Sequence, residues 1–216
     1  IYTLSLHDAL PILVIQADLF NQPLNAWDVS NVDTMSAMFA STLAFNQPLN
    51  NWDTRKVKDM GGMFWGAKAF NQDISSWNTS SVTNMGAMFN EATAFNQPLN
   101  NWNTSSVTYM KDMFRDATAF DQPLDSFEID AITNMEDMLR NCGMSCTNLS
   151  NTLDSWKNQA QRLDKRNVDL GIIYTVDNVY NETGRDAIAV LKAAPLNWTI
   201  RSEEHTSELQ SLVIIS

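Results

Sequence analysis

The sequence predicts an α/β fold in which repeated units stack into a solenoid, and three observations predict it. A unit of 25 residues recurs five times, without insertion or deletion, between Phe20 and about Met144. The spacing of apolar residues changes partway through each unit, which indicates two kinds of secondary structure. The period then stops, and a different pattern suitable for a cap follows. Because a single unit cannot bury its own apolar side, neighbouring units must cover it.

Each unit begins at a phenylalanine and carries a second aromatic residue seven positions later. The two sets are Phe20, Phe45, Phe70, Phe95 and Phe120, and Trp27, Trp52, Trp77, Trp102 and Phe127. The second unit represents the predicted core of all five. Its core residues are Phe45, Leu49, Trp52, Val57, Met60, Met63 and Phe64.

The second half of each unit predicts a short helix. Its apolar positions follow the spacing i, i+3, i+6, i+7, i+10, which places one stripe on one helix face. In the second unit they are Val57, Met60, Met63, Phe64 and Ala67. Polar pairs such as Thr79 and Ser80 stand where they can cap the helix. The repeated methionines are typical of adaptable core filling, not of a metal or cofactor site.

The first half of each unit predicts a short strand. Pro48 cannot donate a hydrogen bond to a neighbouring strand, so pairing is expected to begin after it, over 49–52. Stacked strands would form a parallel sheet with one buried column of Leu24, Leu49, Ile74, Leu99 and Leu124. Beside it, amide side chains are expected to satisfy backbone groups at the turns. These are Asn21, Asn46, Asn71 and Asn96, with Asp121 in the fifth unit, and Gln22, Gln47, Gln72, Gln97 and Gln122.

After Met144 the pattern predicts a capping segment of mixed structure. It contains an amphipathic helix over 150–163, a strand over 169–176, a helix over 184–194 and a final strand over 196–200. The predicted organisation is therefore a five-repeat solenoid over 13–145 and a cap over 146–200. Residues 1–12 and 201–216 resemble translated adapter sequences from sequencing libraries, and we expect them to be artefacts outside the fold.

Composition argues against two classes of function. The formal net charge is −11, which disfavours nucleic acid because phosphate binding needs lysine and arginine. His7 and His205 both lie in the end segments, so the repeats and the cap lack the usual general base and zinc ligand. We therefore expect no enzyme activity and no cofactor.

Two clusters of carboxylates remain as alternatives to a purely structural role. Asp28 and Asp53 share one column, and like charges at that spacing would raise the pKa of at least one of them. The other units carry Asn78, Asn103 and Glu128 there, so turn capping fits all five. A calcium site is the other alternative, since calcium prefers oxygen ligands. Its candidates, Asp121, Asp125, Glu128 and Asp130, do not follow the spacing of a known calcium loop and also suit a solvated acidic rim.

The two cysteines have two interpretations. Cys142 occupies the column of Ala67, Ala92 and Ala117, which predicts a small buried residue. Pairing of Cys142 with Cys146 would require the preceding helix to end between them.

Residues that break the repeat on its exposed side are the candidates for binding. Trp65 stands where other units have alanine, asparagine or arginine, and a group of cations is near it in sequence. A large exposed aromatic beside cations suits an acidic protein or a glycan. The candidate binding residues are Trp65, Arg55, Lys56, Lys58 and Lys68, with Tyr109 as a further break in the pattern. Ordinary variation on a solvated face is the alternative.

The blocks FNQPLNNW, SSVTNMGAMF and EATAF, followed by NCGMS and NWTI, resemble the BspA-like leucine-rich-repeat surface proteins of bacteria. The resemblance spans residues 20–200. It implies a right-handed leucine-rich-repeat-like solenoid in an exported or cell-surface protein that works in adhesion, with membrane association only through segments beyond this chain. Relatives carry a cysteine in the late strand where this chain reads IIYTV, so a disulfide from Cys142 is not expected here.

Two functional hypotheses follow. The first is a non-catalytic surface or secreted module that binds an extracellular protein or glycan. The second is a structural spacer that presents another domain.

Overall fold

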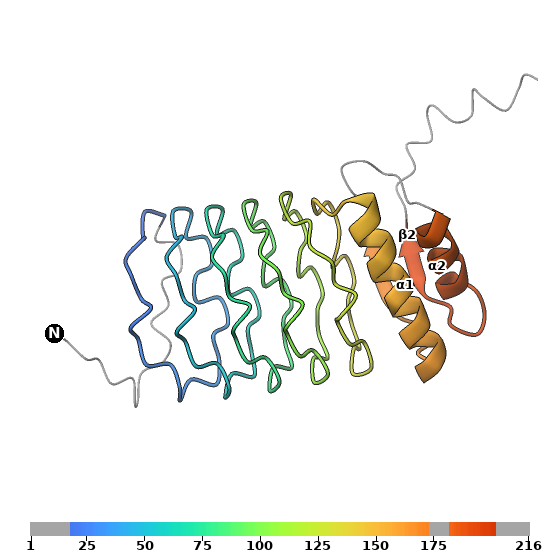
Figure 1. Ribbon diagram of the computed structural model, residues 1–216, viewed down its shortest axis with the longest axis horizontal. Helices are drawn as coiled ribbons and strands as arrows, with labels where there is room; N and C mark the ends of the chain where they lie inside the picture. Colours follow the sequence, from blue (N-terminus) through green and yellow to red (C-terminus); the bar gives the residue numbers. More distant parts are fainter. Residues whose placement is uncertain (1–17, 173–181, 202–216) are drawn as a thin grey trace, which may run out of the picture.

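The computed structural model describes residues 18–172 and 182–201, and its repeats stack side by side along the long axis (Figure 1). We call each stacked 25-residue unit a coil, so that the first begins at Phe20 and the fifth at Phe120. Residues 1–17 and 202–216 lie outside the described residues. They include nearly all of the two end segments, 1–12 and 201–216, that are predicted to be artefacts. The end of the predicted strand over 169–176 also lies outside them.

Backbone hydrogen bonds join each coil to the next at a constant offset. Alternate amides donate to carbonyls 24 positions later: Met60 to Asn84 at 2.9 Å, Gly62 to Gly86 at 2.8 Å and Phe64 to Met88 at 2.9 Å. Parallel bridges of one residue each connect Thr34, Asp59, Asn84, Tyr109 and Asn134 in turn. The invariant period therefore keeps every column of side chains in register.

The prediction of a helix in the second half of each coil is wrong. The amides of Met63, Trp65 and Ala67 donate to carbonyls three residues earlier, at 3.2, 3.0 and 3.0 Å, which makes consecutive β-turns. Two positions in every coil have φ between 53° and 66°, a left-handed conformation that a right-handed helix cannot contain. They are Ala37, Ser41, Gly62, Gly66, Ala87, Glu91, Asp112, Asp116, Asp137 and Asn141. Consecutive turns bury residues three apart, so they reproduce the spacing of a helical stripe.

The prediction of a paired strand over 49–52 is also wrong. The amide of Trp52 donates to the carbonyl of Leu49 at 3.1 Å, so this segment is a turn within one coil. Parallel pairing between coils occurs instead in the segment that had been predicted as a helix. The leucine column is nevertheless buried, with Leu49 fully inaccessible, and the predicted core residues of the second coil are buried as well.

Stacked aromatic rings fill the centre of the coils. Phe45, Phe70 and Phe95 follow one another with ring centroids 6.0 Å apart. A second phenylalanine column packs against the first, with Phe64 at 3.9 Å from Phe70. The tryptophan column lies beside them, and the indole Nε1 of Trp77 donates to the carbonyl of Leu49 at 3.0 Å. Each ring thus contacts the adjacent coil as well as its own.

The polar ladder predicted for the turns is confirmed. The Oδ1 atom of Asn21 accepts the backbone N–H of Asn46 at 3.0 Å and the side-chain amide of Gln47 at 3.0 Å. Asn46 and Asn71 do the same for the following coils. These side chains supply hydrogen bonds where the chain turns away from the ladder.

The C-terminal segment confirms the mixed helix and strand class. It consists of α1 (Cys146–Leu163), β1 (Asp169–Ile172), α2 (Glu182–Lys192) and β2 (Thr199–Arg201), with β1 parallel to β2. Helix α1 begins four residues earlier than predicted because Ser145 caps it, its hydroxyl accepting the N–H of Asn148. Within the described residues, neither helix is both long and apolar enough to cross a membrane.

Helix α1 lies across the last coil (Figure 1) and uses polar side chains where another coil would use its own groups. The Oε1 atom of Gln159 accepts the N–H of Ile129 at 3.1 Å, and its Nε2 donates to the carbonyl of Phe127 at 2.9 Å. The hydroxyl of Thr152 accepts the N–H of Leu124 at 3.1 Å. The helix therefore satisfies backbone groups that the stack leaves exposed at its C-terminal end.

Strand β1 continues the ladder. The N–H of Asp137 donates to the carbonyl of Leu170 at 3.2 Å. Gly171 has φ of 68°, and a Cβ placed on it would lie 2.2 Å from Oδ1 of Asp137. Only glycine fits this close approach.

Both cysteines are free. Cys142 is fully buried, which confirms the small-residue interpretation, and burial raises the pKa of its thiol to about 11. Cys146 is the first residue of α1.

Replacing alanine by glycine at a left-handed turn position tests the turn assignment, because turns and helices predict opposite changes in stability. In a helix, Ala→Gly destabilises by about 1 kcal/mol. Ala87 has φ of 53°, so we expect Ala87→Gly to stabilise the fold by about 0.5 kcal/mol, because relief of strain exceeds the added entropy of the unfolded chain. Chemical denaturation measures the change. The control, Ala92→Gly, alters a buried alanine without positive φ and should destabilise by about 1 kcal/mol; equal losses in both variants would contradict the turn assignment.

The cap gives a second test. Gln159→Ala removes both hydrogen bonds to the last coil, and we expect a loss of about 2 kcal/mol because two backbone groups lose their partners. Gln161→Ala makes the same chemical change at an exposed position of α1 and should stay within about 0.5 kcal/mol of the parent. Thermal and denaturant unfolding report both. Equal stability of the two variants would show that Gln159 does not cap the stack.

Candidate binding surface

Trp65 lies on the outer side of the second coil with 47% of its surface exposed. Its backbone is fixed, since its N–H donates to Gly62 at 3.0 Å and its carbonyl accepts from Ser41 at 2.6 Å. The equivalent positions of the other coils carry Ala40, Asn90, Arg115 and Arg140. The fold therefore uses the backbone hydrogen bonds at this position and does not need the indole.

The four predicted cations lie on either side of Trp65 along the chain. Arg55 forms an ion pair of 2.6 Å with Asp53, and Lys56 donates to Oδ1 of Asn31 at 2.5 Å. Lys58 and Lys68 are exposed. Among the residues that the structure describes, none of the four makes a cation–π contact with the indole of Trp65. Their part in binding stays a prediction.

Tyr109 is 39% exposed and stands at a position where other coils have a residue that caps a turn. In the neighbouring coil, Oδ1 of Asn84 accepts the N–H of Gly86 at 2.9 Å, and Asp59 and Asn134 make the same contact in their own coils. A tyrosine cannot make it. Its ring lies instead over Gly86, where an added Cβ would come within 2.5 Å of Cε1. Tyr109 therefore lacks the hydrogen bond of the turn cap and instead places an exposed ring on a glycine.

The surface that carries these aromatic residues differs between the first three coils and the last two. At the two positions between the columns of Tyr109 and Trp65 that are not part of the hydrophobic core, the first three coils carry only small residues. These are Ser36, Ala37, Gly61, Gly62, Gly86 and Ala87. The fourth and fifth coils carry charged residues there, with ion pairs such as Lys111–Glu136 at 2.6 Å and Arg115–Asp112 at 3.4 Å. We call Trp65, Tyr109 and the six small residues the aromatic face.

The stacked carboxylates Asp28 and Asp53 are turn caps. Oδ1 of Asp28 accepts the N–H of Ser30 at 3.0 Å, and Asp53 does the same for Arg55 at 3.3 Å. Hydrogen bonding to the Arg55 side chain holds the pKa of Asp53 below its usual value. Stacking on Asp28 therefore does not raise the pKa of Asp53, and this carboxylate is not a proton donor near neutral pH.

The calcium alternative finds no support in the geometry. Asp121 uses its Oδ1 atom to accept the N–H of Ser145 at 2.7 Å and the side-chain amide of Asn148 at 2.8 Å. The carbonyl of Asp130 accepts from Lys165 at 2.8 Å. Across residues 18–172 and 182–201, no three histidine, cysteine, aspartate or glutamate side chains are grouped as metal ligands.

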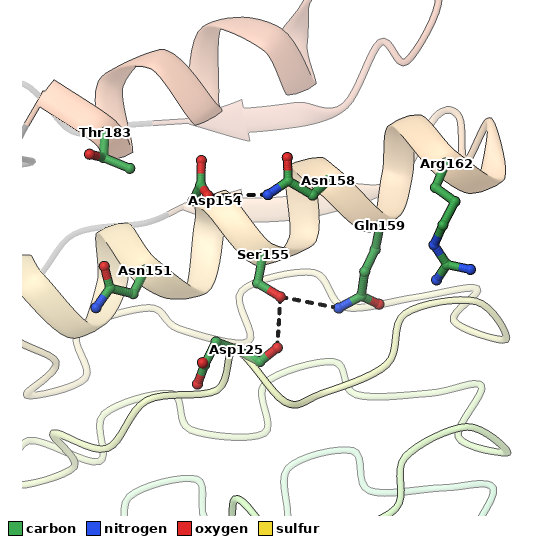
Figure 2. Close-up of a pocket in the computed structure, with 8 residues that line it drawn as sticks. All are labelled: Asp125, Asn151, Asp154, Ser155, Asn158, Gln159, Arg162 and Thr183. Atoms are coloured by element: carbon green, nitrogen blue, oxygen red, sulfur yellow. Dashed lines mark hydrogen bonds between the residues drawn. The ribbon is translucent and has the colours of Figure 1, made fainter.

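A polar groove beside α1 was not predicted from the sequence (Figure 2). It has a volume of about 480 Å³, and its lining comes from the fifth coil, from α1 and from the start of α2. The lining residues are Asp125, Asn151, Asp154, Ser155, Asn158, Gln159, Arg162 and Thr183. The polar side of α1 was visible in the sequence. Its position between the last coil and α2 depends on tertiary packing.

A family model described as "Mycoplasma protein of unknown function, DUF285" matches this chain twice, over residues 11–81 and 48–156. The two matches overlap and together include the five coils and most of α1. No curated protein matches the chain, and no solved structure does.

The Asp121 contacts predict a specific pH dependence. Burial raises the pKa of Asp121, but hydrogen bonds from Ser145 and Asn148 outweigh it and leave the pKa below its usual 3.8. A lowered folded-state pKa stabilises the fold above the unfolded value, and this contribution is lost as the pH falls through the folded value. Asp121→Asn keeps an acceptor oxygen, as in the other coils, without the titration. We expect the parent to lose more unfolding free energy than Asp121→Asn between about pH 5 and about pH 3; parallel losses would contradict the assignment.

Proposed function

The chain belongs to the DUF285 family, and we propose that it is a non-catalytic repeat module that binds an extracellular protein or glycan through its aromatic face. The observation that carries the proposal is the exposure of Trp65 and Tyr109 at positions where the fold does not need an aromatic ring. Exposed tryptophan and tyrosine supply much of the binding energy in protein interfaces.

The local structure supports a rigid contact surface. The backbone of Trp65 is hydrogen-bonded within its coil and to the first coil, and the ring of Tyr109 lies on Gly86. A preorganised surface loses little conformational entropy on binding. On the first two coils, serine, alanine and glycine leave a partner close access to the backbone.

The exposed cations bear on the charge of the partner. Arg55, Lys56, Lys58 and Lys68 are four exposed cations close together in the sequence of an acidic chain. Exposed cations raise association rates with acidic partners in a salt-dependent way. We propose that they favour an acidic protein or glycan, and that nucleic acid is disfavoured by the overall charge of −11.

The proposal also includes the type of repeat and the cellular location of the protein. We propose that the coils form a right-handed solenoid of the BspA-like leucine-rich-repeat type. We further propose that the protein is secreted or at the cell surface and that any membrane association is made by segments outside this chain. The sequence blocks that recur, with substitutions, from coil to coil support both statements.

A purely structural spacer is the second candidate. The unbroken hydrogen-bond ladder from the first coil to β1 favours it, because such a stack is a stiff rod. A spacer needs no exposed aromatic residue at Trp65 or Tyr109, so the two proposals differ in what those residues do.

Replacing both rings by the residue that neighbouring coils carry separates the candidates. Trp65→Asn with Tyr109→Asn should leave the unfolding free energy within about 1 kcal/mol, since asparagine restores the turn cap at 109. We expect binding to immobilised matrix proteins, mucins and glycans to fall about tenfold or more. Surface plasmon resonance on the full chain measures it.

The control introduces asparagine into the same columns on other coils. Thr34→Asn with Arg115→Asn should retain the parent's binding. Equal binding by the aromatic double variant, or no binding to any surface by the parent, would favour the spacer.

A further inference from the structure

The polar groove runs along α1 at the join between the coil stack and the cap (Figure 2). From Asn151 to Arg162 it follows twelve residues of helix, a length of about 16 Å for eleven steps of 1.5 Å. Asp125 lines it from the fifth coil and Thr183 from α2. The groove is therefore elongated, and three elements contribute to its lining.

Part of the lining is fixed by contacts within the protein. The hydroxyl of Ser155 donates to the carbonyl of Asp125 at 2.7 Å, and Gln159 is held against the last coil by two hydrogen bonds. Asp154 is paired with Lys157 and accepts from Asn158 at 3.2 Å. These contacts make the floor of the groove rigid.

Three other lining groups have no partner among residues 18–172 and 182–201. They are the carboxylate of Asp125, the side-chain amide of Asn151 and the guanidinium of Arg162. A carboxylate accepts hydrogen bonds, an amide both donates and accepts, and a guanidinium donates up to five. The groove therefore offers donors and acceptors along its whole length to a bound molecule.

We propose that this groove binds a neutral oligosaccharide. Sugar hydroxyl groups both donate and accept, so neighbouring hydroxyls can engage a carboxylate, an amide and a guanidinium at once. An extended chain of sugar rings matches the shape of a groove about 16 Å long. The site lies beyond the fifth coil and does not depend on the aromatic face.

The composition of the lining disfavours other ligands. Lys157 pairs with Asp154, and the remaining carboxylate of Asp125 balances Arg162, so the groove has no net positive charge to hold a phosphate or another polyanion. The lining has no apolar side chain to anchor a hydrophobic ligand or a peptide residue.

The test uses the full chain and three defined probes: cellotetraose, maltotetraose and tetra-N-acetylchitotetraose. Saturation-transfer NMR and isothermal titration detect binding of each. We expect saturable binding of at least one, weakened about tenfold by Asp125→Ala and by Arg162→Ala, because each removes hydrogen bonds to a charged group. Both side chains are exposed, so the variants should unfold as the parent does.

Two controls separate this site from the aromatic face. Arg166→Ala removes an exposed arginine of the cap that pairs with Asp164 outside the groove, and Trp65→Asn alters the second coil. Both should bind the tetrasaccharide like the parent. Any of three results would overturn the proposal. They are failure of all three probes to bind, unchanged binding in the Asp125 and Arg162 variants, and loss of binding in Trp65→Asn. Loss in Trp65→Asn alone would assign the sugar to the aromatic face instead.

Discussion

The rest of the structure depends on one geometric constraint, the constant offset of the hydrogen bonds between coils. Alternate amides reach carbonyls 24 positions later in coil after coil, as Met60 reaches Asn84 and Met85 reaches Tyr109. This offset places identical side chains above one another, so that rings stack on rings and amides bond to amides. A single coil has neither a complete hydrogen-bond set nor a closed core. Stability is therefore shared between neighbours and is not a property of one repeat.

The same constraint explains the cap. The fifth coil presents backbone groups that a sixth coil would have satisfied, and α1 satisfies several of them with Thr152, Gln159 and Asn148. Strand β1 then continues the ladder through Leu170. A helix with polar residues on its inner side thus supplies hydrogen-bond partners to these backbone groups at the end of the stack. The groove beside α1 lies where this helix packs between the fifth coil and α2.

Much of this could be predicted from the sequence, and the failures have a common physical cause. The buried columns, the asparagine ladder and the order of elements in the cap follow from period and polarity, which are directly visible. The backbone conformation does not follow. Consecutive β-turns and a short helix both bury residues three apart, so Val57, Met60 and Met63 fit either. The signal that separates them is the recurrence of Gly, Asp, Asn and Glu at the left-handed positions, such as Gly62, Asp112 and Asn141. Tyr109 was identified as a break in the pattern, but its contact with Gly86 required the stacking of two coils.

Functional candidates arise where this regularity is broken. Trp65 and Tyr109 expose rings that the neighbouring coils do without, and the polar groove lies where the repeat gives way to the cap. Both sites depend on coils that are interchangeable in register. Removal of residues 70–94, one whole coil of 25 residues, tests that directly, with removal of residues 70–93 as the matched comparison. Circular dichroism and thermal unfolding should show a cooperative fold of lowered stability for the first deletion and loss of that fold for the second. Equal disruption by both deletions would contradict the account.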